Sequence, residues 1–265
     1  MAYFDVLDAI HLHLLPRTYL EIGVSTGTSM TLATPGTRCV GVDPEPRVPA
    51  AIRRRVRVYP TTSDDFFREQ SPAAVLGGQP LDLVFIDGLH LFEAALRDFV
   101  NVEAWSNPDT TVLIHDCYPA NEVGAARERS TAGWSGDVWK LICVLKEWRP
   151  DLQVTVVDAA PTGLGIVRGL DPGSRVLADN FSTIVDSYTA LPYSYLEDNG
   201  GKAAVLNAIP NDWSRVRDLL PATPFRHASR ALARTGRFAW PDRWSFSTSR
   251  LVYRARRSAA RLRRA

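Results

Sequence analysis

The chain has 265 residues, 45% of them hydrophobic, and a formal net charge of +2, which fits one α/β domain with an appendage. It contains no run of about eighteen apolar residues, and its first residues lack the basic and apolar regions of a secretory signal. Its three scattered cysteines argue against a disulfide framework and favour a reducing compartment. These features exclude a membrane-spanning protein and predict a cytoplasmic one.

Charge is unevenly distributed along the chain. Residues 226–265 contain twelve arginines and one acid, a net +11, which leaves a net −9 on residues 1–225. A basic tail on an acidic body indicates a solvated or partner-seeking extension. Docking on a membrane surface or a polyanion is one interpretation, and a frayed or substrate-guiding tail is the more ordinary one. A nucleic-acid partner is disfavoured because the acidic body would repel it.

The hydrophobic periodicity predicts a first helix over residues 2–15 and then strands that alternate with helices. The predicted strands cover residues 19–22, 39–42, 56–59, 81–87 and 110–114. The helices between and after them cover residues 28–34, 50–55, the stretch after the cap cluster 61–65, the stretch from residue 91, and 138–148. Such alternation implies right-handed crossovers and a parallel sheet.

Residues 152–157 and 164–167 read as an antiparallel closing pair, and residues 177–188 and 203–220 look helical. The expected fold is therefore a Rossmann-like, doubly wound α/β sheet. We expect it to be mainly parallel, with an antiparallel closing strand and a C-terminal helical extension.

The turn after the first strand carries the pattern Glu21-x-Gly23-x-x-x-Gly27 with Ser25 between the glycines. This spacing differs from the G-x-G-x-x-G fingerprint of dinucleotide-binding sites, which disfavours an NAD-dependent oxidoreductase. The second strand ends in Asp43, whose carboxylate could accept hydrogen bonds from a ribose diol. The stretch resembles motif I of class I methyltransferases that use S-adenosylmethionine (SAM). An ordinary strand-turn-helix, with glycines for tightness, is the alternative.

In the fold of those methyltransferases, the residues after the third strand lie beside the adenine ring. The resemblance therefore implies that Ser63 and Asp64 contact adenine, whereas the bland interpretation is a helix cap. The full cofactor-binding set that we predict is Glu21, Gly23, Ser25, Gly27, Asp43, Ser63, Asp64 and Asp87.

Two polar clusters stand at the ends of neighbouring strands. Asp87 and His90 follow the fourth strand, and His115 and Asp116 follow the fifth. In an open α/β sheet this edge binds ligands, and carboxylates gathered there suit a divalent cation such as Mg²⁺. His90 is the best candidate base, because the unperturbed pKa of histidine lies near neutrality.

The stretches DLVFIDGLHLFEAALRDF and VLIHDC resemble small metal-dependent O-methyltransferases that act on sugar hydroxyls, including enzymes of macrolide-sugar and actinobacterial glycan methylation. More distantly they are similar to catechol O-methyltransferase. The resemblance implies that Asp87 is a metal ligand, that His90 is the base and that His115 and Asp116 close the site. His115 departs from the carboxylate that relatives often have there. It could favour Mn²⁺, stand behind the ligands, or contact the substrate. The predicted metal set is Asp87, His115 and Asp116.

Residues 117–138 form an insertion that is too long for an ordinary loop between a helix and a strand. We interpret it as a substrate lid, whose aromatic and polar side chains could hold a sugar. Internal packing of the insertion is the alternative. Trp134 is a further member of this group, and the predicted substrate residues are Tyr118, Asn121, Glu122 and Trp139.

The sequence thus predicts a SAM- and divalent-metal-dependent O-methyltransferase that acts on a sugar, an oligosaccharide or a glycosylated metabolite. The alternatives are methylation of a phenol or catechol, a non-catalytic SAM-binding protein, and a polyanion-binding protein held by its tail. We divide the chain into a methyltransferase domain, a helical cover or dimerisation segment and an arginine-rich tail, at residues 1–170, 171–225 and 226–265. A homodimer is expected.

Overall fold

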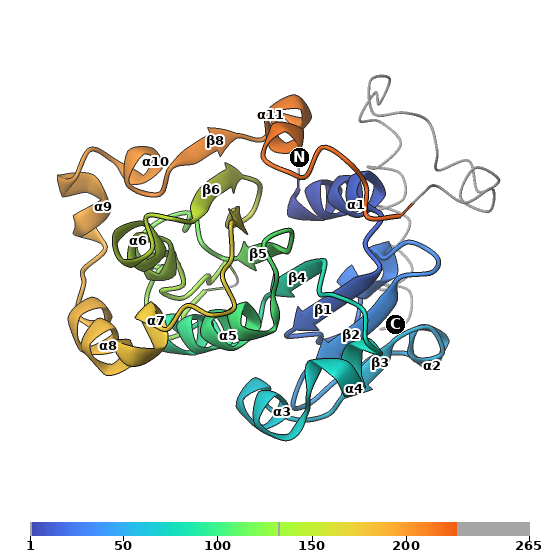
Figure 1. Ribbon diagram of the computed structural model, residues 1–265. Coiled ribbons are helices and arrows are strands. Elements are labelled where there is room, and N and C mark those ends of the chain that lie inside the picture. The colour runs from blue at the N-terminus through green and yellow to red at the C-terminus, as the bar shows by residue number, and fades with distance from the viewer. Residues whose placement is uncertain (1, 132, 227–265) are drawn as a thin grey trace, which may run out of the picture. The chain divides into compact units, whose positions relative to one another are not determined.

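The structure, a computed structural model, describes residues 2–131 and 133–226. All but the first residue of the predicted arginine-rich tail lies outside this part of the chain, and so do the hypotheses that concern it. An eight-stranded sheet runs through the described residues in the order β3-β2-β1-β4-β5-β7-β6-β8 (Figure 1). The strands are β1 (Thr18–Ile22), β2 (Arg38–Val42), β3 (Arg57–Tyr59), β4 (Leu83–Ile86), β5 (Thr111–His115), β6 (Gln153–Asp158), β7 (Leu164–Arg168) and β8 (Ala208–Pro210).

Strand β7 is antiparallel to both of its neighbours, and every other neighbouring pair is parallel. The predicted Rossmann-like sheet, mainly parallel with an antiparallel closing strand, is therefore confirmed. Since the parallel strands β1 to β5 all run the same way, the loops that follow them gather at one edge of the sheet.

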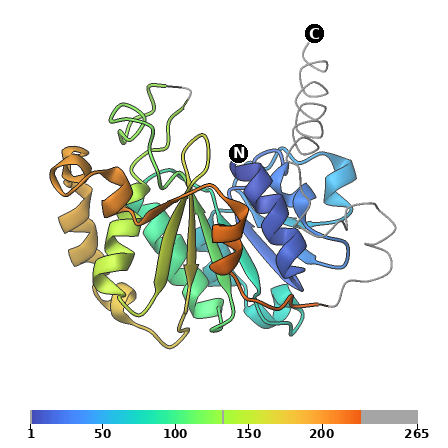
Figure 2. The ribbon, with the colours of Figure 1, turned by 90° about the horizontal axis from the view of Figure 1, so that it is seen from above.

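Helices cover both faces of this sheet (Figures 1 and 2). They are α1 (Tyr3–Leu14), the 3₁₀ helix η1 (Ser29–Leu32), α2 (Ala50–Arg53), α3 (Ser63–Glu69), α4 (Pro72–Leu76), α5 (Phe92–Trp105), α6 (Trp139–Trp148), α7 (Val176–Asp179), α8 (Phe181–Thr189), α9 (Ser194–Asp198), α10 (Lys202–Val205) and α11 (Trp213–Asp218). Successive residues of a strand point to opposite faces of the sheet and so enter two separate hydrophobic cores. From β1, Leu20 and Ile22 pack with residues of α5 and α6, whereas Tyr19 packs with residues of α1 and α11.

Two predicted helices are corrected by the structure. The stretch 28–34, expected to begin a helix, forms only the 3₁₀ helix η1. Pro35 and Gly36 directly follow this stretch, and Gly36 takes a positive φ of 89°, so no helix continues from it. The helix expected over residues 203–220 is broken into α10, β8 and α11. Asn207 adopts a φ of 50°, and β8 then pairs in parallel with β6 at the edge of the sheet.

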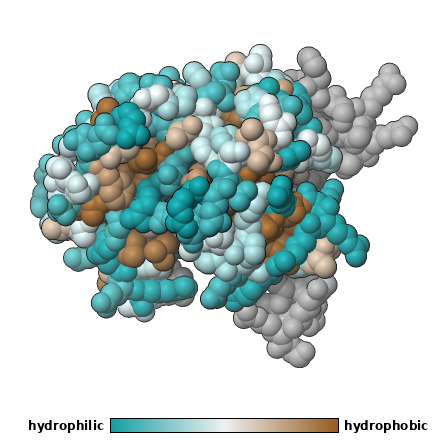
Figure 3. Space-filling view, turned by 60° about the horizontal axis from the view of Figure 1, so that its bottom comes forward, coloured by the Kyte–Doolittle hydropathy of each residue, from teal (hydrophilic) through white to brown (hydrophobic). Residues whose placement is uncertain are grey.

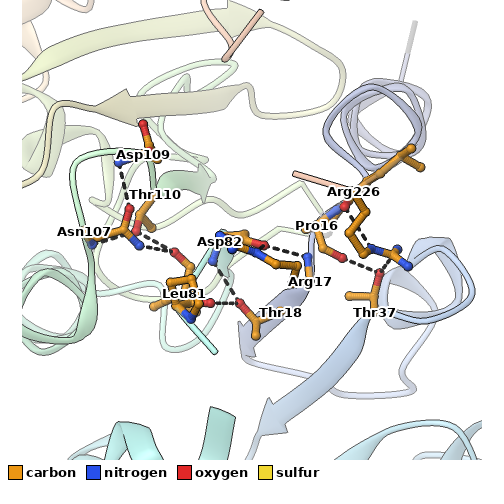
Figure 4. Close-up of polar contacts among 12 residues, drawn as sticks. Pro16, Arg17, Thr18, Thr37, Leu81, Asp82, Asn107, Asp109, Thr110 and Arg226 are labelled. Carbon is orange, nitrogen blue, oxygen red and sulfur yellow. Dashed lines mark hydrogen bonds and ion pairs between the residues drawn. The ribbon is translucent and has the colours of Figure 1, made fainter. Parts of the chain in front are cut away.

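The amino ends of β1 and β4 are fixed by a buried carboxylate (Figure 4). Asp82 is fully buried and accepts hydrogen bonds from Arg17 Nε at 2.9 Å and Arg17 Nη2 at 2.6 Å. Its backbone N–H donates to Thr18 Oγ1 at 2.9 Å. These contacts lie at the start of the strands, so they hold the sheet from the end opposite to the predicted site.

No helix within residues 2–131 and 133–226 is both long enough and apolar enough to cross a membrane. On the face in Figure 3, hydrophobic patches alternate with hydrophilic side chains. The exposed large hydrophobic side chains of the described part are Leu89, Val123 and Val176. The first of these lies beside the cavity described next.

Candidate active site

A cavity of about 740 Å³ opens where the loops after β1, β2, β3, β4 and β5 meet. Part of the 117–138 insertion forms another wall. The residues from the insertion are Arg129, Gly133 and Trp134, and the polar residues from the strand ends include Ser25, Asp43, Ser63, Asp64, Asp87, His90, His115 and Asp116. The fold thus brings most of the predicted polar residues into one cavity.

The glycine turn after β1 approaches the end of β4 very closely. Gly23 lines the cavity with a φ of 87°, and a Cβ placed on it would lie only 1.9 Å from the backbone oxygen of Asp87. Only glycine fits this position. Gly27 also has a positive φ, but it packs against Val48 and does not line the cavity. Of the two glycines of the motif, the first therefore faces the ligand space and the second shapes the turn.

Asp43 is held in place by two backbone N–H groups. Its Oδ2 accepts from Ser25 at 2.7 Å, and its Oδ1 accepts from Glu45 at 2.8 Å. The carboxylate also lines the cavity. A carboxylate has about four lone-pair sites, so acceptor capacity remains for a ligand diol.

Glu21 lies beneath this turn rather than in the cavity. It is fully buried and accepts hydrogen bonds from the hydroxyls of Tyr19, at 2.7 Å, and Ser29. Burial raises its pKa to about 8, although both hydroxyls oppose the shift. In this geometry the Glu21 side chain does not reach the cavity where a cofactor would bind. It instead links β1 to η1.

At the β3 side of the cavity, the cap hypothesis holds for Thr62, whose Oγ1 accepts from the backbone N–H of Asp65 at 3.1 Å. Ser63 and Asp64 line the cavity. The carboxylate of Asp64, however, is paired with Arg97 at 2.9 Å. Asp98, which the sequence analysis did not select, is buried and lines the same region.

The four polar residues after β4 and β5 form one cluster. His115 Nδ1 lies 3.0 Å from Asp87 Oδ1 and 3.2 Å from Asp116 Oδ2. His90 Nδ1 lies 3.0 Å from Asp116 Oδ2, while its Nε2 is 3.8 Å from Asp87 Oδ1. Two carboxylates and two imidazoles are therefore in mutual contact at the sheet edge.

Electrostatics in this cluster favour charge on His115. Burial lowers the pKa of the imidazole, but the carboxylates of Asp87 and Asp116 outweigh it and raise the pKa to about 10. Burial likewise opposes ionisation of Asp116, yet His115, His90 and a hydrogen bond from Thr162 hold its pKa below the usual value. In the absence of a cation, His115 thus balances the charge of the carboxylates.

The donor set fits a metal ion, but with a different third member from the one predicted. Ligand atoms of Asp87, His90 and Asp116 all lie within 4.8 Å of one another. His90 Nδ1 and Asp116 Oδ2 are buried and face each other without hydrogen-bond geometry, as expected of atoms that share a cation. In this group His90 takes the place that the sequence analysis gave to His115, whose ring instead contacts both carboxylates.

The insertion is folded back over His90. The Trp134 ring stacks on the imidazole at a centroid distance of 5.0 Å and an angle of 10°, and its Nε1 donates to the Ala126 carbonyl at 2.6 Å. The Arg129 guanidinium lies 5.9 Å from the centroid of the Trp134 ring. Gly136 has a φ of 60°, and a Cβ there would lie 1.7 Å from the His90 oxygen, so the chain passes directly against the candidate base.

Arg127 and Asp137 fasten this insertion to the body and pair with each other. Arg127 Nη2 binds Glu93 at 2.6 Å and its Nη1 binds Asp137 at 2.7 Å. Asp137, which is 1% exposed, also binds Lys140 at 3.1 Å and accepts from the Phe92 N–H at the start of α5 at 2.8 Å. The candidate lid is therefore anchored at the helix that follows the candidate base.

None of the four predicted substrate residues lines the cavity. The prediction that Trp139 contacts the substrate is wrong, because its side chain is 1% exposed and packs in the hydrophobic core. Tyr118, Asn121 and Glu122 do not line the cavity; Tyr118 packs under Lys202 Nζ at 4.1 Å from its ring centroid, and Asn121 Oδ1 accepts from a backbone N–H of the insertion. Trp134, named with them but not chosen, is the aromatic residue that reaches the cavity.

The fold and the cavity define a class of protein. A mainly parallel sheet with an antiparallel strand beside β5, a glycine turn after β1 and a carboxylate after β2 is the Rossmann-like methyltransferase fold. A family model described as a methyltransferase domain matches residues 20–117. This match runs from β1 to the residue after Asp116, and it supports the predicted class of enzyme, a SAM-dependent methyltransferase.

Solved structures similar to the chain include the O-methyltransferase TomG from Streptomyces achromogenes in complex with SAM, with 18% identity, a TM-score of 0.47 and coverage of 64% of this chain and 80% of that one. An O-methyltransferase from Bacillus cereus in complex with SAH has 18% identity, a TM-score of 0.44 and coverage of 63% and 79%. The SAH-bound methyltransferase PaMTH1 from Podospora anserina has 16% identity, a TM-score of 0.47 and coverage of 63% and 76%. A search of curated proteins finds no match.

Proposed function

We propose that the chain transfers the methyl group of SAM to a hydroxyl oxygen of a small-molecule acceptor, with a divalent cation at the site. One observation carries this proposal: the glycine turn and Asp43 share a cavity with the cluster of Asp87, His90 and Asp116. A methyl donor bound at the first set of residues and an acceptor hydroxyl at the second would face each other.

The cofactor end of the cavity supports SAM through its geometry. Gly23 lines the cavity and, because it lacks a side chain, lets the turn after β1 lie directly against the loop after β4. Asp43 offers a fixed acceptor to the ribose diol. We assign the cofactor to the side of the cavity at the ends of β1 and β2. The sulfonium carbon then points toward the cluster after β4.

Asp87 and Asp116 would hold the cation, with His90 beside them. A bound divalent ion would supply Lewis acidity, which lowers the pKa of a coordinated hydroxyl. His115 keeps the two carboxylates together through its Nδ1 atom. Mg²⁺ and Mn²⁺ are the candidate ions, because carboxylate ligands suit both.

A neutral imidazole has a single nitrogen lone pair available, so His90 cannot ligate the cation and accept a proton at the same time. We propose that His90 leaves the cation to the two carboxylates and accepts the hydroxyl proton. Its Nδ1 faces Asp116 at 3.0 Å, whereas Nε2 is 3.8 Å from Asp87, beyond hydrogen-bond distance. Trp134 covers one face of the imidazole and limits its rotation. The ring is thus held with one nitrogen toward the carboxylates and the other open to the cavity.

Two classes of acceptor remain in the proposal. A sugar or glycosylated acceptor is supported by the polar composition of the insertion. A phenol or catechol is favoured by the walls near His90, because Leu89, Trp134 and Pro161 all line the cavity and offer apolar surface to a planar ring. The polar residues chosen from the sequence as a sugar platform do not line the cavity.

Residues 171–225 pack on the body of the fold: α8 contacts α5 and α6, and β8 extends the sheet. We propose that this segment covers the sheet edge and offers a dimer contact in a cytoplasmic enzyme. A mass measurement in solution at several protein concentrations tests the dimer.

The central experiment incubates the full chain with SAM and separate panels of saccharides and catechols, with Mg²⁺, with Mn²⁺ and with excess EDTA. We expect a gain of one methyl mass on one panel and release of S-adenosylhomocysteine, both abolished by EDTA. Undiminished transfer in EDTA would reject the metal, and transfer to neither panel would reject both acceptor classes.

The variant His90→Ala tests the proposed base. We expect it to bind SAM as the parent does but to lose at least about a hundredfold in turnover, the usual worth of a positioned base. Glu122→Ala is the matched control, because Glu122 is an exposed titratable residue of the neighbouring insertion that does not line the cavity. Full activity of His90→Ala would contradict the assignment.

A further inference from the structure

The cavity presents its polar groups in the order of the strands. Ser63 follows β3, Asp43 follows β2, Gly23 follows β1, and Asp87 follows β4. Under the proposed function, on which this inference rests, the ribose lies at Asp43 and the reacting methyl lies near Asp87. The base of the nucleoside must then extend the other way, toward the end of β3.

A buried carboxyl lies at that end of the cavity. Asp98 is 3% exposed, yet it lines the cavity, and it comes from α5 on the side that contacts α3. A Cβ placed on Gly88 would lie 3.4 Å from its Oδ2, so the carboxyl sits against the loop after β4. Ser63 is its hydrogen-bond partner, and burial raises its pKa to about 7.

No salt bridge reaches Asp98 within the part of the chain that the structure describes. The neighbouring cation, Arg97, is instead paired with Asp64, and both of those side chains are about half exposed, at 45% and 46%. A buried carboxylate with a single hydroxyl partner has unused acceptor capacity, which is costly unless a donor arrives. Asp64 also lines the cavity, but its carboxylate is paired with Arg97, so Asp98 is the carboxyl with acceptor capacity left for a ligand.

We propose that Asp98, assisted by Ser63, recognises the exocyclic amino group of the adenine ring of SAM. The amino group offers two N–H donors, and an ionised carboxyl in a buried wall is the acceptor that such donors need. A purine with a carbonyl oxygen at the same position would place an acceptor against a carboxylate. Asp98 thus selects adenine over its deaminated counterpart, whereas the sequence suggested Ser63 and Asp64 as the adenine contacts.

The test measures binding of S-adenosylhomocysteine and S-inosylhomocysteine by calorimetry at pH 8.5, where Asp98 is ionised. We expect the full chain to prefer the adenine compound by about tenfold or more, because an unpaired buried acceptor is costly. In Asp98→Asn the preference should fall to about threefold or less, since an amide can donate to a carbonyl as well as accept from an amino group. Asp64→Asn is the matched control and should keep the preference of the parent.

Several results would overturn the proposal. They are a parent that binds both compounds equally, an Asp98→Asn variant that keeps the full preference, and an Asp64→Asn variant that loses it. Should Asp98→Asn fail to fold, Ser63→Ala replaces it in the test. An unchanged preference of Ser63→Ala for the adenine compound would contradict the proposed role of Asp98 and Ser63. A parent that binds neither compound rejects the SAM assignment itself. A parent that discriminates but transfers no methyl group rejects only the proposed function.

Discussion

Trp134 is the side chain whose position the geometry explains most directly. It stacks on His90 at 5.0 Å and is fixed by its hydrogen bond to Ala126. An aromatic pair of this kind contributes about 1 kcal/mol beyond area burial, which is enough to restrict an imidazole that otherwise has two χ angles free. Its effect on catalysis would be through the orientation of the base.

Replacing Trp134 by alanine should therefore lower kcat by about tenfold or more, because a misplaced catalytic group is costly, while the affinity for S-adenosylhomocysteine stays unchanged. Trp134→Phe keeps a stacking ring and should recover most of the rate. Steady-state kinetics with the identified acceptor separate kcat from KM. If phenylalanine were as damaging as alanine, stacking would not be the reason.

Glu21 gives a prediction about pH and stability. Its carboxyl is fully buried and its pKa is raised to about 8, so the folded state holds a proton that the unfolded chain releases near 4.5. Stability from this group is fully present below about pH 4.5 and is lost as the pH rises toward 8. Glu21→Gln removes the titration but keeps the size of the side chain.

We therefore expect urea unfolding to give similar free energies for the parent and Glu21→Gln at pH 5. At pH 8.5 the variant should be more stable, by an amount on the order of a few kcal/mol. Comparing the difference between the two proteins cancels the other groups that titrate in this window. A difference that did not change with pH would mean that Glu21 is already ionised at pH 5.

At the scale of elements, short-range patterns predicted the strands β1 to β7 well, because each is a short apolar run bounded by turn residues. Strand β8 was missed, since Ala208–Pro210 has three residues, ends in proline and forms only by pairing with β6, about fifty positions earlier. Its existence depends on a contact that no local pattern encodes.

The candidate site likewise contains some residues that local sequence patterns could reveal and one that they could not. Asp87, His90 and Asp116 could be found because they directly follow strands, and the topology of a parallel sheet gathers such positions. Asp98 lies within α5, and its approach to Ser63 depends on how α5 packs on α3. One signal was present: positions 95, 98 and 102 share the buried face of the helix, so an acid there is out of place.

The insertion could be recognised by its length, but not by which aromatic residue it presents. Trp134 and Trp139 are five positions apart, and α6 begins at the second of them, so one faces the cavity and the other enters the core. The point where an irregular segment becomes a buried helix decided their roles. Asp137 stands just before that point and accepts from the Phe92 N–H, 45 positions earlier, a contact that no local pattern encodes.

At the scale of the whole molecule, Arg226 is the last described residue, and it closes the fold where α1 meets β1. Its Nε donates to the Leu15 carbonyl at 3.1 Å, its Nη1 donates to the Pro35 carbonyl at 3.0 Å, and its Nη2 donates to Thr34 at 2.8 Å and Thr37 at 3.1 Å. A charged donor in four contacts contributes more than a surface arginine usually does. The chain up to this residue therefore forms the compact unit.

Two truncations that differ by one residue test this closure. The chain that ends at Arg226 should bind S-adenosylhomocysteine as well as the full chain does, because the cavity residues all precede it. The chain that ends at residue 225 should lose about 1–3 kcal/mol, the worth of hydrogen bonds to a charged group. If the two truncations were equally stable, Arg226 would be an ordinary surface residue.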